Sequence, residues 1–409
     1  MLHVREHPRQ QPVLERALAQ CWRDHGASLP PLECDDGSRL RVLYPGRASA
    51  SAGPDFRDAV LQREGGEVVR GDVELHLRRG GWEAHGHGGD RNYNAVVLHV
   101  VLRGGDGPVV LASGRRAPTA VLFPRTLGRC RKRETLPPPR PLPLAALPSS
   151  ANRLARTLDR EGDARFFEKV RAFTQELQAH PDPSEALYRG LMGGLGYGGN
   201  SPAMTRLADG LSLPALIRAL RGGEPEERRS ALASALLQAS GLVTEEHPPG
   251  QVTPVLSRSD WKLFRVRPTN RPSRRLEGMA ALLDRAWDEG LASWAVSLVR
   301  EGSVAGVRAG LTIASEAGGA LIGADRASDL AVNVLLPFVR AWGNRNRDTE
   351  LAAAAVALYR AWPQLQENAV TEEAARVLGI AEDKGFRRSA RRQQGLIRVY
   401  RRRLRGEAA

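Results

Sequence analysis

The stretch that decides the fold of the first part of the chain is GDVELHL, residues 71–77. Apolar and polar side chains alternate along it, which predicts a β-strand with one buried face. Its apolar members are expected to face a core. Its polar members, Asp72, Glu74 and His76, are expected to form one row on the opposite face. The sequence therefore places two carboxylates and an imidazole side by side.

Runs typical of β-strands lie on both sides of this stretch. We predict strands over residues 39–44, 56–62, 67–77, 95–102, 109–112 and 120–123. The run AVVLHVVL at 95–102 is nearly all apolar, as expected for a central strand that is buried on both faces. Residues 11–25 carry apolar side chains at helical spacing behind Pro12, which predicts a helix before the sheet.

A proline-rich run, ETLPPPRPLPLAALPSS at residues 134–150, predicts a stiff linker. Before it, residues 1–133 are expected to form a nuclease-like α/β domain built on a mixed sheet. After it, residues 151–409 are expected to form a helical domain that ends in a basic helix. Helical spacing of apolar side chains covers residues 152–158, 164–179, 185–192, 214–220, 226–239, 273–287, 325–342, 350–362 and 386–405. The predicted fold class is therefore α+β.

The charge of the chain favours a polyanionic partner. Of 409 residues, 60 are basic and 46 acidic, which gives a formal net charge of +14. Nucleic acid is the simplest such partner, and no apolar run is long enough to span a membrane. Because only four of the basic residues are lysines, the excess of arginine also fits a GC-rich genome. The three cysteines form no Cys-X-X-Cys pair, which favours a reducing, cytoplasmic compartment.

Asp55 lies behind a turn at Gly53 and Pro54, at the start of the predicted strand 56–62. If this strand pairs antiparallel with the strand that holds Glu74, the two carboxylates converge. Carboxylates hold hard dications such as Mg²⁺ or Mn²⁺ in this way. A bound cation of this kind activates water for hydrolysis. Asp55 and Glu74 are therefore the predicted metal ligands.

The pair Pro54-Asp55, followed by Glu74-Leu75-His76, resembles the motif of the PD-(D/E)XK nuclease superfamily, with histidine in the lysine position. The resemblance implies a restriction-endonuclease-like core of a helix, three strands, a helix and a fourth strand. It also implies metal-dependent cleavage of nucleic acid, with Asp55, Glu74 and His76 as catalytic residues. His76 is expected to orient or deprotonate the attacking water near neutral pH, since an unperturbed histidine has a pKa of ~6.5.

Further polar residues are expected to support the metal ligands. They are Glu15, Asp72, His85, His87, Asp90 and His99. The segment HGHGGD at 85–90 has two other interpretations: a Zn²⁺ site of a different hydrolase, formed by its two histidines and its aspartate, or a solvated loop. His99 stands in an apolar strand, where it is either a core histidine or part of the site. Tyr93 is expected to be a packing residue.

Several pieces of sequence run in order along the chain: GPDFRDAVL, GDVELH, WEAHGHGGDRNYNAVVLHVV, GLGYGGN, RPTNRP and SARRQQGLIRVY. Together they resemble an uncharacterised bacterial family known as domain of unknown function 2851. This resemblance implies no particular activity.

Arginines in two regions are the predicted nucleic-acid contacts: a turn in the helical half and the last helix. They are Arg267, Arg271, Arg274, Arg275, Arg387, Arg388, Arg391, Arg392, Arg398 and Arg402. No base-reading motif accompanies them, so we expect binding without base specificity. Three hypotheses stay open: a metal-dependent nuclease-like phosphodiesterase, a non-catalytic nucleic-acid-binding or scaffold protein with a degraded nuclease core, and a zinc-dependent hydrolase.

Overall fold

In a computed structural model, the chain divides into two compact units, one of residues 1–146 with 401–409 and the other of residues 147–400. The structure describes residues 11–49, 53–104, 107–122, 151–196, 199–220, 227–243, 252–263, 266–315, 318–380 and 388–405. The predicted linker, 134–150, lies outside the described residues. Each unit is considered by itself below.

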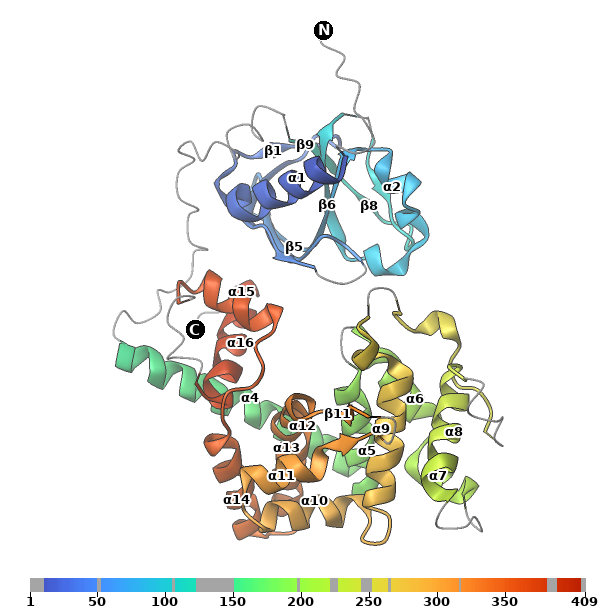
Figure 1. Ribbon diagram of the computed structural model, residues 1–409. Helices are drawn as coiled ribbons and strands as arrows, with labels where there is room; N and C mark the ends of the chain where they lie inside the picture. The colour runs from blue at the N-terminus through green and yellow to red at the C-terminus, as the bar shows by residue number, and fades with distance from the viewer. Residues whose placement is uncertain are drawn as a thin grey trace. The chain divides into compact units, whose positions relative to one another are not determined.

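A mixed seven-stranded sheet forms the centre of the first unit (Figure 1). Its strands are β1 (Leu32–Glu33), β2 (Arg39–Tyr44), β3 (Arg47–Ala48), β4 (Phe56–Arg63), β5 (Val68–Arg78), β6 (Val96–Arg103) and β9 (Thr119–Val121). The order across the sheet is β1-β2-β4-β5-β6-β9, with β3 paired to β4. Strands β2, β4 and β5 are antiparallel neighbours, whereas β6 runs parallel to both β5 and β9.

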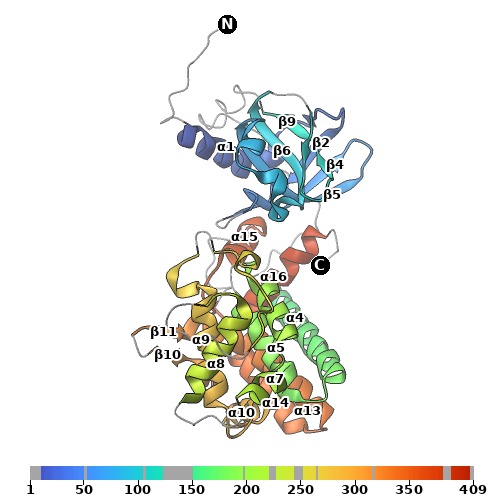
Figure 2. The same cartoon turned by 90° about the vertical axis from the view of Figure 1, so that its right-hand side faces the viewer.

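The helix α1 (Gln11–His25) packs on one face of this sheet, against β5 (Figure 2). Leu18 and Trp22 of α1 share a buried core with Val73 and Leu75 of β5. Because side chains alternate along a strand, Glu74 and His76 point to the other face. That face is covered by α2 (Gly81–Ala84), by the short turns η2 (His87–Gly89) and η3 (Arg91–Tyr93), and by the hairpin of β7 (Val109–Val110) and β8 (Arg116–Ala117).

The second unit is mostly helical. Its elements are α4 (Ala151–Ala179), α5 (Pro183–Leu195), α6 (Ser201–Gly210), α7 (Leu213–Ala219), α8 (Arg228–Ser240), η6 (Arg258–Asp260), η7 (Pro268–Asn270), α9 (Pro272–Arg285), α10 (Leu291–Arg300), α11 (Val304–Leu311), β10 (Ile313–Ala314), β11 (Ala320–Ile322), α12 (Ala324–Leu330), the π-helical η8 (Ala331–Leu335), α13 (Leu336–Arg345), α14 (Thr349–Ala361), α15 (Ala369–Val377) and α16 (Ala390–Leu404). One continuous apolar core joins most of these helices.

The predicted class, an N-terminal mixed sheet followed by a helical region, is confirmed. Two local predictions are wrong. The helices expected at 152–158 and 164–179 are one helix, α4, because the polar stretch between them stays helical. The hairpin of β10 and β11 interrupts a region that we expected to be all helical, since a pair of such short strands leaves no alternating pattern.

Among the described residues, no helix combines the length and apolar character that a membrane span requires. Cys34 is a buried free thiol, whereas Cys21 is disulfide-bonded. The reducing, cytoplasmic compartment stays a prediction.

Candidate metal centre

Asp55 and Glu74 lie together, and each is held by the other's strand. The antiparallel register of β4 and β5 pairs Phe56 with Val73, which brings the residue before β4 next to Glu74. The backbone N–H of Asp55 donates to Glu74 Oε2 at 3.0 Å. The backbone N–H of Leu75 donates to Asp55 Oδ2 at 3.1 Å. These two reciprocal bonds fix both carboxylates on the polar face of the sheet.

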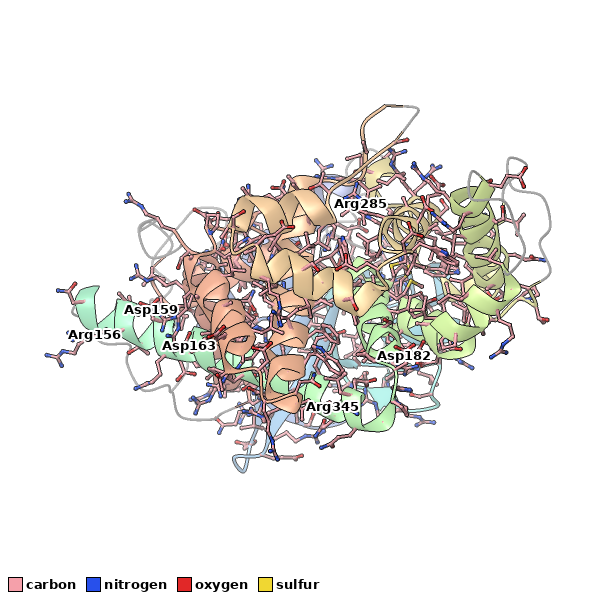
Figure 3. All side chains as sticks on the ribbon, turned by 90° about the horizontal axis from the view of Figure 1, so that it is seen from below. Arg156, Asp159, Asp163, Asp182, Arg285 and Arg345 are labelled. Atoms are coloured by element: carbon pink, nitrogen blue, oxygen red, sulfur yellow. The ribbon has the colours of Figure 1, made fainter. Side chains whose placement is uncertain are left out.

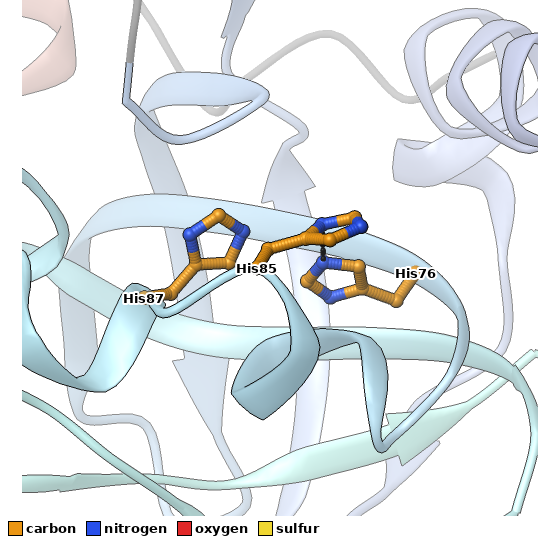
Figure 4. A group of neighbouring side chains, drawn as sticks. All are labelled: His76, His85 and His87. Carbon is orange, nitrogen blue, oxygen red and sulfur yellow. Dashed lines mark hydrogen bonds between the residues drawn. The ribbon is translucent and has the colours of Figure 1, made fainter.

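Imidazole rings surround Glu74. His87 Nε2 lies 3.2 Å from Glu74 Oε1, and His76 Nε2 lies 3.7 Å from the same oxygen. His76 Nε2 also lies 3.1 Å from His85 Nδ1. Figure 4 shows the rings of His76, His85 and His87 gathered in one place. One nitrogen from each of these three rings lies within 4.8 Å of the others.

A second row of contacts holds these rings in place. His76 Nδ1 lies 2.9 Å from His99 Nε2, and His99 Nδ1 lies 3.3 Å from Thr119 Oγ1. The ring of Tyr93 stacks on His87, with ring centroids 3.9 Å apart. The buried ring of Trp82 meets His87 and His99 edge-on. Tyr93 is therefore a packing residue, as its sequence context predicted.

Glycines allow the conformation of the segment between β5 and His87. Gly81 begins α2 directly above His76, and a Cβ atom at this position would lie 2.5 Å from His76 Cδ2. Gly86 has a φ of +70°, in the left-handed region that favours glycine. This turn brings His87 back over Glu74. His85 stays exposed on the outer side of the group.

Burial shifts the pKa values of both carboxyls and of several histidines in the centre. It raises the pKa of Glu74 to about 8, and the nearby charge of Glu15 adds to this. Burial, followed by the charge of Glu74, raises the pKa of Asp55 to about 7. Burial lowers the pKa of His76 to about 3, with further contributions from the neighbouring histidines. Burial of His76, which is 3% exposed, therefore disfavours the expected protonation of its ring near neutral pH.

The remaining predicted supporting residues fall into two groups. His85, His87 and His99 belong to the centre itself, and the charge of Glu15 on α1 reaches both carboxyls. Asp72 instead accepts a hydrogen bond from the backbone N–H of Asp58, at 3.1 Å. It supports the bulge in β4 rather than the cluster.

Asp90 does not join His85 and His87 as the zinc interpretation required. Its Oδ1 accepts from the backbone N–H of Asn92 at 2.8 Å and caps the turn η3. This is a correction: the Asp90 carboxylate is engaged in its own turn and is not part of the group of converging ligand atoms. The third member of the group is His76 of β5, and not Asp90 as expected.

Thr119 and Trp82 are the residues of the centre that the sequence did not reveal. Thr119 is the first residue of β9, and the parallel register pairs it with His99 of the neighbouring strand β6. No pattern in the sequence indicates this pairing. Trp82 follows Gly81 in the loop and reads simply as an apolar residue.

Comparison with known families bears on the chain as a whole. The model of the family described as "Protein of unknown function (DUF2851)" matches residues 15–249, more than half of the chain. The chain belongs to this family. The match spans all residues of the candidate metal centre, together with α4 to α8. No curated protein and no solved structure matches the chain.

The arginines of α16 have intramolecular partners. Arg391 pairs with Asp163 of α4, with Nε 2.8 Å from Oδ1, and Arg392 pairs with Asp159 at 3.0 Å. Asp159 and Asp163 lie four residues apart on α4 (Figure 3). Arg398 binds both Glu161 and Glu168 of the same helix. Acidic side chains of α4 thus already pair with these three arginines, and their contact with nucleic acid stays a prediction.

Some arginines in and after the turn before α9 also have intramolecular partners. Arg275 is buried and donates to the carbonyl of Leu321 at 2.7 Å and to Asn270 Oδ1 at 2.6 Å. Arg274 donates to the carbonyl of Ala320 at 3.4 Å. Both therefore support the β10–β11 hairpin, which corrects their predicted role. Among the other predicted contacts, Arg267, Arg271 and Arg388 are exposed, Arg402 is partly buried and has an interaction partner of its own, and Arg387 lies outside the described residues.

Proposed function

We propose that this protein is a metal-dependent, nuclease-like phosphodiesterase that acts on nucleic acid, with Asp55 and Glu74 as carboxylate ligands of the cation. The observation that carries the proposal is the pair of reciprocal backbone bonds that locks the two carboxylates together beside His87. Two buried acids side by side are costly to keep ionised unless a cation joins them.

The order of elements supports this proposal. A helix, α1, precedes the antiparallel strands β2, β4 and β5; the short helix α2 follows; and β6 then pairs parallel to β5. The PD-(D/E)XK motif that the sequence resembles belongs to a core with this order of helix, three strands, helix and strand. Asp55 and Glu74 stand on the middle strands of that order.

The residues also fit a divalent cation. His87 Nε2 is buried and has no hydrogen-bond partner, although Glu74 Oε1 lies 3.2 Å away. An unsatisfied buried polar atom costs about 1–3 kcal/mol. A cation between the two atoms would satisfy both lone pairs. Bound there, it would lower the pKa of a water molecule and stabilise charge that develops on a phosphoryl group.

The side chains around the carboxylates have separate tasks in this proposal. The depressed pKa of His76 keeps its ring neutral across the physiological range. Both of its nitrogens have partners, so His76 orients the site rather than removing a proton from water. His85 is exposed, so substrate approaches the carboxylates from its side.

Cleavage assays with the full chain test the proposal. Purified protein is incubated with labelled single- and double-stranded DNA and RNA in Mg²⁺, Mn²⁺ or Zn²⁺. Asp55→Asn and Glu74→Gln should each reduce the rate at least ~100-fold, because the charge on the cation's ligand is lost. Both amides retain an oxygen that accepts the backbone N–H bond, so folding is preserved. Glu33→Gln, an exposed change on β1, is the matched control.

Two results would contradict the proposal: no cleavage by the unsubstituted protein under any of these conditions, or full cleavage by both variants. Binding of nucleic acid without cleavage would favour the alternative, a nucleic-acid-binding protein with a degraded nuclease core. Histidine in the lysine position is the observation that favours that alternative.

A further inference from the structure

We infer that Glu74, His76, His85 and His87 form a binding site for a first-row transition-metal dication, and that Mg²⁺ is not its natural occupant. The inference rests on the proposed function for the place of the cation, and it adds the chemical class of that cation. It concerns binding, so it does not require that the protein cleave a phosphodiester.

The spacing of the candidate ligand atoms matches a coordination sphere. The three measured separations are 3.1 Å from His76 Nε2 to His85 Nδ1, 3.2 Å from His87 Nε2 to Glu74 Oε1, and 3.7 Å from His76 Nε2 to Glu74 Oε1. Four atoms placed ~2.0–2.1 Å from one Zn²⁺ in a tetrahedron lie about 3.3–3.4 Å from each other. Two of the measured separations, His76–His85 and His87–Glu74, lie close to this value.

The type of ligand decides the class of ion. Three imidazole nitrogens lie within 4.8 Å of one another here, and Glu74 Oε1 lies beside two of these rings, those of His76 and His87. Mg²⁺ takes oxygen ligands in a near-octahedral shell and keeps several waters, whereas imidazole suits Zn²⁺, Fe²⁺, Ni²⁺ and Cu²⁺. A pair of carboxylates alone would select a hard cation. The rings that crowd Glu74 shift the preference towards transition metals.

Burial supports a bound ion over a set of mutual hydrogen bonds. His76 and Glu74 are 3% and 5% exposed, and His87 Nε2 has no hydrogen-bond partner. Each neutral imidazole has one N–H to donate and one lone pair. His87 thus keeps a buried nitrogen aimed at a carboxylate without the geometry of a bond. A cation uses this lone pair, and exposed His85 places one ligand of the site at the protein surface.

Two residues behind the site set the tautomer of His76. If Nε2 of His76 binds the ion, its proton must lie on Nδ1, where it donates to His99 Nε2 at 2.9 Å. His99 then carries its own proton on Nδ1 and donates to Thr119 Oγ1 at 3.3 Å. Outer partners of this kind orient metal-binding histidines and raise their basicity. Thr119 and His99 are therefore positioning residues for His76.

Cobalt titration of the full chain tests the inference. Co²⁺ is the probe, because its visible absorption reports nitrogen ligands and coordination number directly. The unsubstituted protein should bind one Co²⁺ per chain and keep it in a large excess of Mg²⁺. His85→Ala and His87→Ala should each weaken binding by more than the ~10–100-fold typical of losing an outer partner. His180→Ala, at a histidine of the helical unit that lies near Glu176, is the matched control.

Because His85 is exposed, its replacement leaves the fold intact, which circular dichroism verifies. The inference is overturned if Co²⁺ binds the His85 and His87 variants as tightly as the unsubstituted protein, or if Mg²⁺ displaces it at comparable concentration. Cobalt binding with no nuclease activity under any metal would overturn the proposed function and leave this site standing. Cleavage that Mg²⁺ supports without Co²⁺ binding would do the reverse.

Discussion

His76 has a neighbour on each ring nitrogen, so a change in one neighbour alters what the other nitrogen can do. Its Nδ1 meets His99, and its Nε2 faces His85 and Glu74. A ring that carries one proton cannot donate on both sides. The neighbour at Nδ1 therefore controls whether Nε2 presents a lone pair to a cation.

Two replacements of His99 distinguish its role as a hydrogen-bond acceptor for His76 from its role in filling space. His99→Leu removes the acceptor for His76 Nδ1–H and should weaken Co²⁺ or Zn²⁺ binding by ~10–100-fold. His99→Gln keeps an oxygen that accepts from His76 and should recover most of the affinity. Calorimetric titration of the metal measures both. Equal weakening in the two variants would mean that His99 acts only by filling space.

Gly81 tests how tightly the loop must close over His76. Gly81→Ala places a Cβ atom 2.5 Å from His76 Cδ2, which forces the ring or α2 to move. We expect a loss of about 1–3 kcal/mol in the free energy of unfolding, together with weaker metal binding. Gly80→Ala is the control, because a Cβ atom there meets nothing within 4 Å. Chemical denaturation measures the free energy of unfolding of both variants. An equal loss in the two would contradict this account.

At the scale of residues, part of the candidate metal centre could be predicted from the sequence. The alternation in 71–77 placed Glu74 and His76 on one face, and the Pro54 turn brought Asp55 beside Glu74. Thr119 could not be predicted, because its place follows from a parallel pairing with His99 that leaves no local pattern. Asp90 was misplaced because a capping aspartate and a metal-binding aspartate look alike in sequence.

At the scale of elements, α4 and α16 form a close helix pair in the second unit. Acidic residues of α4 pair with Arg391, Arg392 and Arg398 of α16. Between these pairs, Gly395 of α16 lies so close to α4 that a Cβ atom would overlap the carbonyl oxygen of Leu158. The basic helix is therefore an integral part of the helical unit.

This arrangement explains why the charge of α16 was misread from the sequence. Nine arginines within residues 386–405 indicate a solvated or phosphate-binding helix when they are viewed alone. The acidic partners of Arg391, Arg392 and Arg398 lie more than 220 residues earlier in the chain. Local periodicity predicts a helix here correctly, but it carries no information about which distant helix packs against it.

Gly395→Ala should therefore destabilise the helical unit strongly. Since the obstructing atom is backbone, α4 and α16 must separate, and we expect a cost of about 3 kcal/mol, the upper end of overpacking effects. Gly323→Ala is the control, because its Cβ atom would meet only Ala320 Cβ at 3.8 Å. Thermal denaturation followed by circular dichroism compares the two. A midpoint for Gly395→Ala equal to that of the control would show that the two backbones are not in contact.

At the scale of the whole molecule, a net charge of +14 remains although many arginines are paired internally. An arginine that pairs with an acidic side chain of the same chain is less available to bind a phosphate. Truncating the chain at α16 cannot test nucleic-acid contact, because Leu396 and Val399 of that helix are fully buried and their loss would unfold the unit. A test must remove exposed arginines and leave the core untouched.

Arg267 and Arg271, exposed on the two sides of the turn η7, provide such a test. The double variant Arg267→Gln/Arg271→Gln should weaken binding to DNA and RNA of any sequence. It should also reduce the slope of log affinity against log salt by about 1 for each arginine that no longer meets a phosphate. Fluorescence anisotropy over a series of salt concentrations measures this slope.

Arg206→Gln/Arg300→Gln removes the same charge from exposed arginines that already pair with Asp260 and Asp348, so it is the matched control. If nucleic acid meets the η7 turn, only the first double variant reduces the slope, by about 2. An equal change in both would mean that the chain attracts polyanions through its overall charge alone. In that case the predicted contacts in this turn are wrong, while the proposal for the candidate metal centre of the first unit is unaffected, since neither variant changes any of its residues.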